Sequence, residues 1–164
     1  MGQFAGDGTI HALSEKMAPL KPVDFHGSAR RHMADANLLD LNNRFPNAGH
    51  LYGYVAECGL KALLIGLGYP TDLEGSPVQQ KPNFKVHINT LVAPATFMSL
   101  NLFLDGRAGA KYLALISGIG DFSDWRVEHR YYSEAALPSS LTKWKAAAHE
   151  VGRMLDQAKT HGVI

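Results

Sequence analysis

The spacing of apolar residues along the chain predicts helices separated by short turns. The clearest pattern is the last one, in which apolar residues follow one another in alternating steps of three and four: Leu141, Trp144, Ala148, Val151, Leu155 and Ala158. This spacing places them on one side of a helix that packs against a neighbour in a left-handed manner. Ser139 or Ser140 can cap the start of this helix, and Gly162 closes it.

Two further helices are expected in the first half of the chain. From Phe25 to Leu39 apolar residues recur every three or four positions, and Asp24 is a suitable N-cap. Pro46 suits the first turn of a second helix, over residues 47–67, which is apolar on nearly every side. A helix of that kind is usually central in a bundle.

The remaining segments complete an all-helical pattern. Residues 70–85 are rich in Pro, Gly and Gln and predict a loop, after which a helical region starts at His87 and is disturbed by Pro94. Another helix is expected over residues 108–116. No alternating strand is recognisable, so the predicted fold class is all-α, an up-and-down antiparallel bundle of four to five helices. We expect a flexible N-terminal arm over residues 1–22 and one helical bundle over residues 23–162.

Composition and charge narrow the function classes. The 164 residues include 16 basic and 15 acidic side chains, a net charge of +1, so a global basic field for nucleic acids is absent and any such contact is local. The single cysteine, Cys58, excludes an intramolecular disulfide and a thiol zinc site, and its apolar neighbours favour a buried filler over a nucleophile. No signal-peptide pattern precedes the bundle, and the apolar run over residues 60–67 is too short to span a bilayer. We expect a cytoplasmic protein without membrane association, metal or cofactor.

Candidate chemistry concentrates in residues 121–132, which hold two arginines, one histidine, three carboxylates and four aromatics. Arginine presents planar donors to phosphate, histidine moves protons near neutral pH, and aromatics stack on bases. These groups suit a metal-free phosphodiester cleavage site or a nucleotide-binding site. The alternative is a solvated loop, anchored by its Trp and Tyr side chains, in which the charges pair among themselves.

A second polar feature lies in the apolar helix, where Glu57 and Lys61 are spaced i to i+4 in the favourable order. They form either a helix-surface ion pair or part of a site. In the second case, Trp125 and Tyr131 are expected as buried anchors of the loop. The side chains expected to line a groove near Glu57 and Lys61 are those of Arg126, Glu128, His129 and Arg130.

Three segments of the sequence resemble the HEPN family, the "higher eukaryotes and prokaryotes nucleotide-binding" domain. Residues 48–64 (AGHLYGYVAECGLKALL) are similar to its Ala-x-x-Leu-x-Gly-x-x-Ala-Glu-x-x-Leu-Lys helix. Residues 85–91 (KVHINTL) match a Lys-x-His-x-x-x-Leu element, and residues 125–131 (WRVEHRY) match a Trp-x-x-Glu-x-Arg-Tyr segment. The resemblance implies a bundle of four to five helices, usually a homodimer, in a bacterial toxin–antitoxin, defence or nucleotidyltransferase-associated system.

One departure from the family pattern affects the expected activity. Active HEPN ribonucleases carry Arg, four to six residues and then His, whereas only two residues separate Arg126 from His129. Arg44 and His50 have the right separation but straddle the first interhelical turn. The expected function is therefore binding of a nucleotide, an RNA or a partner protein (such as a nucleotidyltransferase) by a catalytically degenerate bundle. The alternative is a metal-independent endoribonuclease. The candidate catalytic residues are Arg126, His129 and Arg130, and the candidate nucleotide- or RNA-binding residues are Glu57, Lys61, Trp125, Glu128 and Tyr131.

Overall fold

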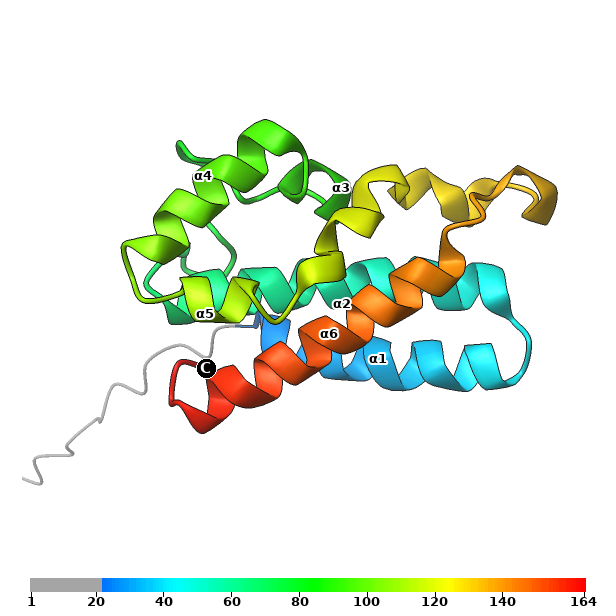
Figure 1. The fold of residues 1–164 in the computed structure, drawn as a ribbon, viewed down its shortest axis with the longest axis horizontal. Helices are drawn as coiled ribbons and strands as arrows, with labels where there is room; N and C mark the ends of the chain where they lie inside the picture. Colours follow the sequence, from blue (N-terminus) through cyan, green and yellow to red (C-terminus); the bar gives the residue numbers. More distant parts are fainter. Residues whose placement is uncertain (1–21) are drawn as a thin grey trace, which may run out of the picture.

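Three long helices form the frame of the molecule. The computed structural model describes residues 22–164, and over that range the chain is helical with connecting loops and no β-strand (Figure 1). Helices α1 (Phe25–Leu41) and α2 (Phe45–Gly66) run antiparallel, and α6 (Leu141–Thr160) crosses α2 and also contacts α1. The predicted all-helical class is confirmed for this part of the chain. The predicted arm, apart from Pro22, lies outside the described residues.

The ends of the long helices follow from local chemistry. The Asp24 carboxylate accepts a hydrogen bond from the Gly27 amide at 2.8 Å, which confirms it as the N-cap of α1. Pro46 lies in the first turn of α2, where its missing N–H leaves no helical hydrogen bond unmade. Beyond the other end of α2, Gly68 has a φ of +93°, a conformation that glycine adopts without steric cost. The expected bounds of both helices are correct to within two residues.

Helix α2 is the centre of the core, and glycine allows its neighbours to come close. A Cβ atom on Gly49 would lie 2.2 Å from the Leu141 side chain, and one on Gly59 would lie 2.2 Å from Val151. Both neighbours belong to α6, so small residues on α2 set the separation of the two helices. The predicted apolar face of α6 is confirmed, since Trp144, Ala148, Val151, Leu155 and Ala158 are all buried.

Between α2 and α6 the chain is broken into short helical pieces. They are α3 (Ile88–Leu91), α4 (Pro94–Asp105), α5 (Ala110–Leu113) and the 3₁₀ segments η1 (Ser117–Asp124), η2 (Val127–Tyr131) and η3 (Glu134–Ala136). The predicted loop before α3 is confirmed. The helix predicted over residues 108–116 is wrong in its extent, because Ala108 has a φ of +55° and only the four residues of α5 are α-helical.

Two further observations bear on function. No helix of the described part is long and apolar enough to cross a membrane. Cys58 is a free thiol buried in α2, and burial raises the pKa of that thiol to about 12. The thiol is therefore protonated at neutral pH, and the prediction of a buried filler is confirmed.

Candidate functional site

Trp125, which directly follows η1, is completely buried against α2. A Cβ atom on Gly53 would lie 2.1 Å from the indole, so the ring lies directly on the helix backbone. The His50 ring stacks on the indole at a centroid distance of 5.3 Å, and the Tyr54 ring meets it edge-on at 5.5 Å. Trp125 therefore anchors the η1–η2 corner to α2, as the sequence predicted.

Beside this aromatic cluster, Glu57 holds two cationic or potentially cationic groups. Its Oε1 accepts from Lys61 Nζ at 2.7 Å, and its Oε2 lies 3.0 Å from Nδ1 of His87, the residue before α3. The Glu57 and Lys61 side chains are only 10% and 8% exposed, whereas the His87 side chain is 51% exposed. The ion pair is therefore not on the helix surface. When His87 donates through Nδ1, its Nε2 is left able to accept a proton.

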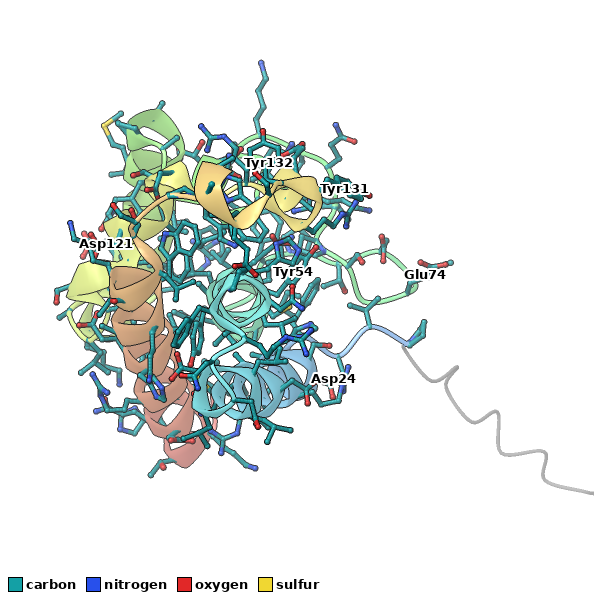
Figure 2. The ribbon with its side chains drawn as sticks, turned by 90° about the vertical axis from the view of Figure 1, so that its right-hand side faces the viewer. Asp24, Tyr54, Glu74, Asp121, Tyr131 and Tyr132 are labelled. Carbon is teal, nitrogen blue, oxygen red and sulfur yellow. The ribbon has the colours of Figure 1, made fainter. Side chains whose placement is uncertain are left out.

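Arg130 and two more histidines lie around Tyr54. The His32 ring of α1 is 5.4 Å from the Tyr54 ring, and the His50 ring is 4.9 Å from it. Burial lowers the pKa of His50, and the positive charge of Arg130 lowers it further. Burial raises the pKa of the Tyr54 hydroxyl, while the guanidinium of Arg130 opposes that shift. In the view of Figure 2, Tyr131 and Tyr132 from the segment around η2 lie above Tyr54 of α2.

These residues form what we call the α2 face: His32, His50, Tyr54, Glu57, His87 and Arg130. At neutral pH the His50 and His32 rings are uncharged, because burial lowers both pKa values. Arg130 contributes a permanent positive charge, and Glu57 is the buried carboxylate that orients His87. Such a face offers hydrogen-bond donors and one cation to an anionic ligand.

Part of the predicted loop site lies elsewhere. His129 is buried, with its ring stacked on that of Trp144 at 5.9 Å and its Nδ1 accepting from the backbone amide of Arg126 at 3.3 Å. The guanidinium of Arg126 donates to the carbonyl oxygens of Ser123 and Trp125 at 3.0 and 3.1 Å. The predicted groove is wrong for His129, because its ring packs toward α6 and not beside Glu57.

The outer residues of the loop also differ from expectation. Tyr131 was predicted as a buried anchor, but it is 74% exposed, and the Arg130 guanidinium lies 4.7 Å from its ring centroid. Glu128 is exposed and forms no ion pair with any residue of the described part. Of the three predicted catalytic residues, only Arg130 reaches the α2 face.

Four members of the α2 face are absent from the candidates predicted from the sequence: His32, His50, Tyr54 and His87. Two of them had a readable signal, because His50 and Tyr54 precede the predicted Glu57 and Lys61 in steps of four, three and four, so all four share one side of α2. That pattern was hidden because the helix is apolar on its other sides. His87 belonged to one of the segments that resemble the HEPN family, but nothing in the sequence paired it with Glu57.

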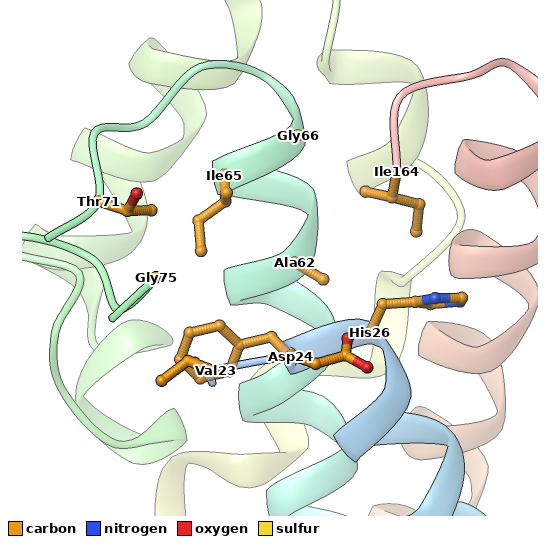
Figure 3. A pocket seen from close by; sticks show the side chains of 10 residues that line it. Val23, Asp24, His26, Ala62, Ile65, Gly66, Thr71, Gly75 and Ile164 are labelled. Atoms are coloured by element: carbon orange, nitrogen blue, oxygen red, sulfur yellow. The ribbon is translucent and has the colours of Figure 1, made fainter. Parts of the chain in front are cut away.

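In the part of the chain that the structure describes, neither a metal site nor the hollow beside the start of α1 competes with the α2 face. Residues 22–164 contain no group of three or more His, Cys, Asp or Glu side chains arranged to hold a metal ion. A hollow of about 230 Å³ lies between the start of α1 and the end of α2 and includes Asp24, His26 and Ile164 in its lining (Figure 3). The Asp24 carboxylate there already caps α1, so we favour the α2 face as the functional site.

Comparisons of this chain with protein-family models, with curated proteins and with solved structures give no match.

Proposed function

We propose that this chain is a cytoplasmic HEPN-type protein, an up-and-down bundle of four to five helices, that binds RNA or a nucleotide through the α2 face. Its setting would be a bacterial toxin–antitoxin, defence or nucleotidyltransferase-associated system. The observation that carries the proposal is the convergence of three separate segments. Residues 48–64 supply Glu57, residues 85–91 supply His87, and residues 125–131 supply Arg130. These are the three segments that resemble the family.

The chemistry of the α2 face suits a phosphate flanked by a base. Arg130 is exposed and permanently charged, and it can donate two parallel hydrogen bonds to phosphate oxygens. The exposed ring of Tyr131 lies under the same guanidinium and provides a surface for base stacking. When the His87 ring carries a proton on both nitrogens, its Nε2–H adds a second donor from another segment while Nδ1–H stays on Glu57. The buried residues position these groups: Glu57, paired with Lys61, orients His87, and Trp125 anchors the loop that carries Arg130.

A metal-independent endoribonuclease is the second candidate, and the Glu57–His87 pair favours it. A buried carboxylate that orients an exposed imidazole is the arrangement of a general base. In this reaction His87 Nε2 would take the proton of the ribose 2′-hydroxyl, whose oxygen then attacks phosphorus. The bond from phosphorus to the 5′-oxygen breaks, and that oxygen takes a proton from water. Arg130 would stabilise the negative charge on the phosphate oxygens.

The test uses a labelled single-stranded oligoribonucleotide in the presence of EDTA. Arg130→Ala should weaken binding roughly tenfold to a hundredfold, the usual cost of losing a hydrogen bond to a charged group. Arg153→Ala, on the exposed side of α6, is the matched control and should bind as the unmodified protein does. Absence of RNA and nucleotide binding by the unmodified protein would contradict the proposal.

Cleavage is scored on the same samples. If the second candidate is right, the unmodified protein cleaves the RNA in EDTA, and His87→Asn abolishes cleavage while binding persists. RNA that remains intact after long incubation with the unmodified protein would contradict the endoribonuclease and leave binding as the proposed function.

We also propose a homodimer with an isologous interface, in which each helix meets its own copy. Exposed apolar side chains around the α1–α2 turn, namely Leu38, Leu41 and Phe45, are available for such a contact. Light scattering at micromolar concentration should give the mass of two chains. A monomer mass that persists as the concentration rises would contradict the dimer.

A further inference from the structure

A second surface, unrelated to the α2 face, lies along α4. One hollow of about 610 Å³ is bounded by Lys81, Pro82, Ser99, Leu102 and Phe103. A neighbouring hollow of about 350 Å³ shares Pro82 and Ser99 with it and extends along α4 to Ala95. We call the two together the α4 trough. From Ala95 to Phe103 the helix rises roughly 12 Å, or about two turns.

Large apolar side chains are exposed in and beside the trough. Leu102 is 69% exposed and Met98, four residues earlier on the same side of α4, is 63% exposed. Phe103 forms part of the wall, and the Arg107 guanidinium covers its ring at 3.9 Å from the centroid. An exposed pair of large apolar side chains beside a hollow is typical of a protein-binding surface.

Lys81 is the charged side chain in the lining of the trough, and no Asp or Glu of the described residues lines either hollow. Residues 75–104, which supply all of its lining, contain Lys81 and Lys85 but no Asp or Glu. Lys85 is paired with Asp72 at 3.4 Å, whereas Lys81 lies at the hollow and has no ion pair within the described range. Arg107 lies two residues beyond Asp105, which is the last residue of α4 and lies outside the lining of both hollows. A partner that fits must therefore offer apolar side chains and carboxylates together.

We propose that the α4 trough binds an acidic amphipathic segment of a partner protein. Its apolar side chains would contact Met98 and Leu102, and its carboxylates would meet Lys81 and Arg107. A second copy of this chain fits less well, because an isologous contact would place the same surface of both copies together, Lys81 and Arg107 included, and so bring like charges close to one another. RNA fits less well too, because the large side chains exposed along the trough, those of Met98 and Leu102, are aliphatic and offer no aromatic ring for base stacking.

The probe is a fluorescent synthetic peptide that repeats Leu and Glu, so that the leucines share one face of a helix. It is titrated against the full chain, and against the variants Leu102→Asp and Lys81→Glu. Both substitutions should lower the affinity by about tenfold or more, since they affect the centre and the charged rim of the contact. In the same series, Lys81→Glu should bind a peptide with Lys in place of Glu more tightly than the unmodified chain does.

Two matched variants control for exposure and for net charge. Leu73→Asp alters a more exposed leucine away from the trough, and Lys143→Glu reverses an exposed lysine on α6. Both should bind the Glu peptide with unchanged affinity, and far-ultraviolet spectra should show that all four variants are folded. The proposal is overturned if the unmodified chain shows no saturable binding of the Glu peptide, or if the control variants lose affinity equally. It is also overturned if the unmodified chain binds single-stranded oligouridine and the substitutions Leu102→Asp and Lys81→Glu abolish that binding.

Discussion

At the scale of single residues, the burial of Glu57 determines how much its charge contributes to folding stability. Glu57 and Lys61 are buried together. Removing one partner of a buried ion pair is strongly destabilising, because the other charge is left buried without a counter-charge. The pair formed by Arg30 and Asp156 joins α1 to α6 at 2.8 Å, but both side chains are more than half exposed. Water and salt screen such a pair, which therefore contributes little.

The first prediction compares these two pairs. Glu57→Gln should lower the free energy of unfolding by roughly 3 to 5 kcal/mol, because the Lys61 ammonium is left buried without a counter-charge. Asp156→Asn should lower it by less than about 1 kcal/mol. Urea denaturation measures both. Adding Lys61→Met to Glu57→Gln should recover part of the loss, and a similar small effect from both single variants would show that the Glu57 carboxylate is hydrated.

At the scale of secondary-structure elements, small residues on α2 determine what can approach it. Gly53 receives the Trp125 indole, and Gly49 and Gly59 receive side chains from α6. The loop that carries Arg130 is therefore positioned by contact with a helix backbone. A glycine within a helix weakens that helix by up to about 1 kcal/mol relative to alanine. At these positions the lower helix propensity is offset by the close packing that glycine permits.

The second prediction concerns Gly53→Ala. The added methyl group would lie 2.1 Å from the indole, so Trp125 must move, and the free energy of unfolding should fall by roughly 1 to 3 kcal/mol. The matched control is Gly120→Ala in η1, where no atom lies within 4 Å of the added Cβ. That variant should change stability by less than about 1 kcal/mol. Denaturation measures both, and a stabilised Gly53→Ala protein would contradict the packing of Trp125 on α2.

Elements with a strong period or a local cap could be predicted from sequence, and elements that depend on distant contacts could not. The first two helices and α6 are correct because their apolar spacing, together with the Asp24 cap of α1 and Pro46 in the first turn of α2, is local to each element. Ser140 illustrates the limit: it precedes α6 as predicted, but its hydroxyl bonds to the Asp124 carboxylate and does not cap the helix. For His129, the chemistry of the side chain can be read from the sequence, but the direction of its ring depends on Trp144 in another element.

At the scale of the whole molecule, the fold lowers the pKa of several histidines. Burial is the main cause that lowers the pKa values of His32, His50, His129 and His149 in the fold. In the unfolded chain these side chains titrate near the ordinary value of about 6.5. At pH values between the lowered pKa values of the folded state and about 6.5, the unfolded chain binds more protons than the folded chain does. Folding stability therefore increases with pH over that range.

The third prediction follows from that sign. The free energy of unfolding should be largest above about pH 6.5 and should decrease as the pH falls through the lowered pKa values. Urea denaturation at a series of pH values measures this slope. His50→Gln should make the slope shallower, because it removes one of the contributing groups. A stability that stays constant or rises on mild acidification would contradict the burial of these rings.

The stacking of histidine on tryptophan, noted at two places, also has an optical consequence. The chain has two tryptophans, and each indole stacks on an imidazole, Trp125 on His50 and Trp144 on His129. A protonated imidazole in contact with an excited indole quenches its fluorescence, whereas the neutral ring quenches much less. Emission should therefore dim on acidification before the helices melt. In Trp144→Phe protein the dimming reports on the imidazole rings that lie against Trp125, those of His50 and His87, so binding of a phosphate at the candidate site can be followed without any label.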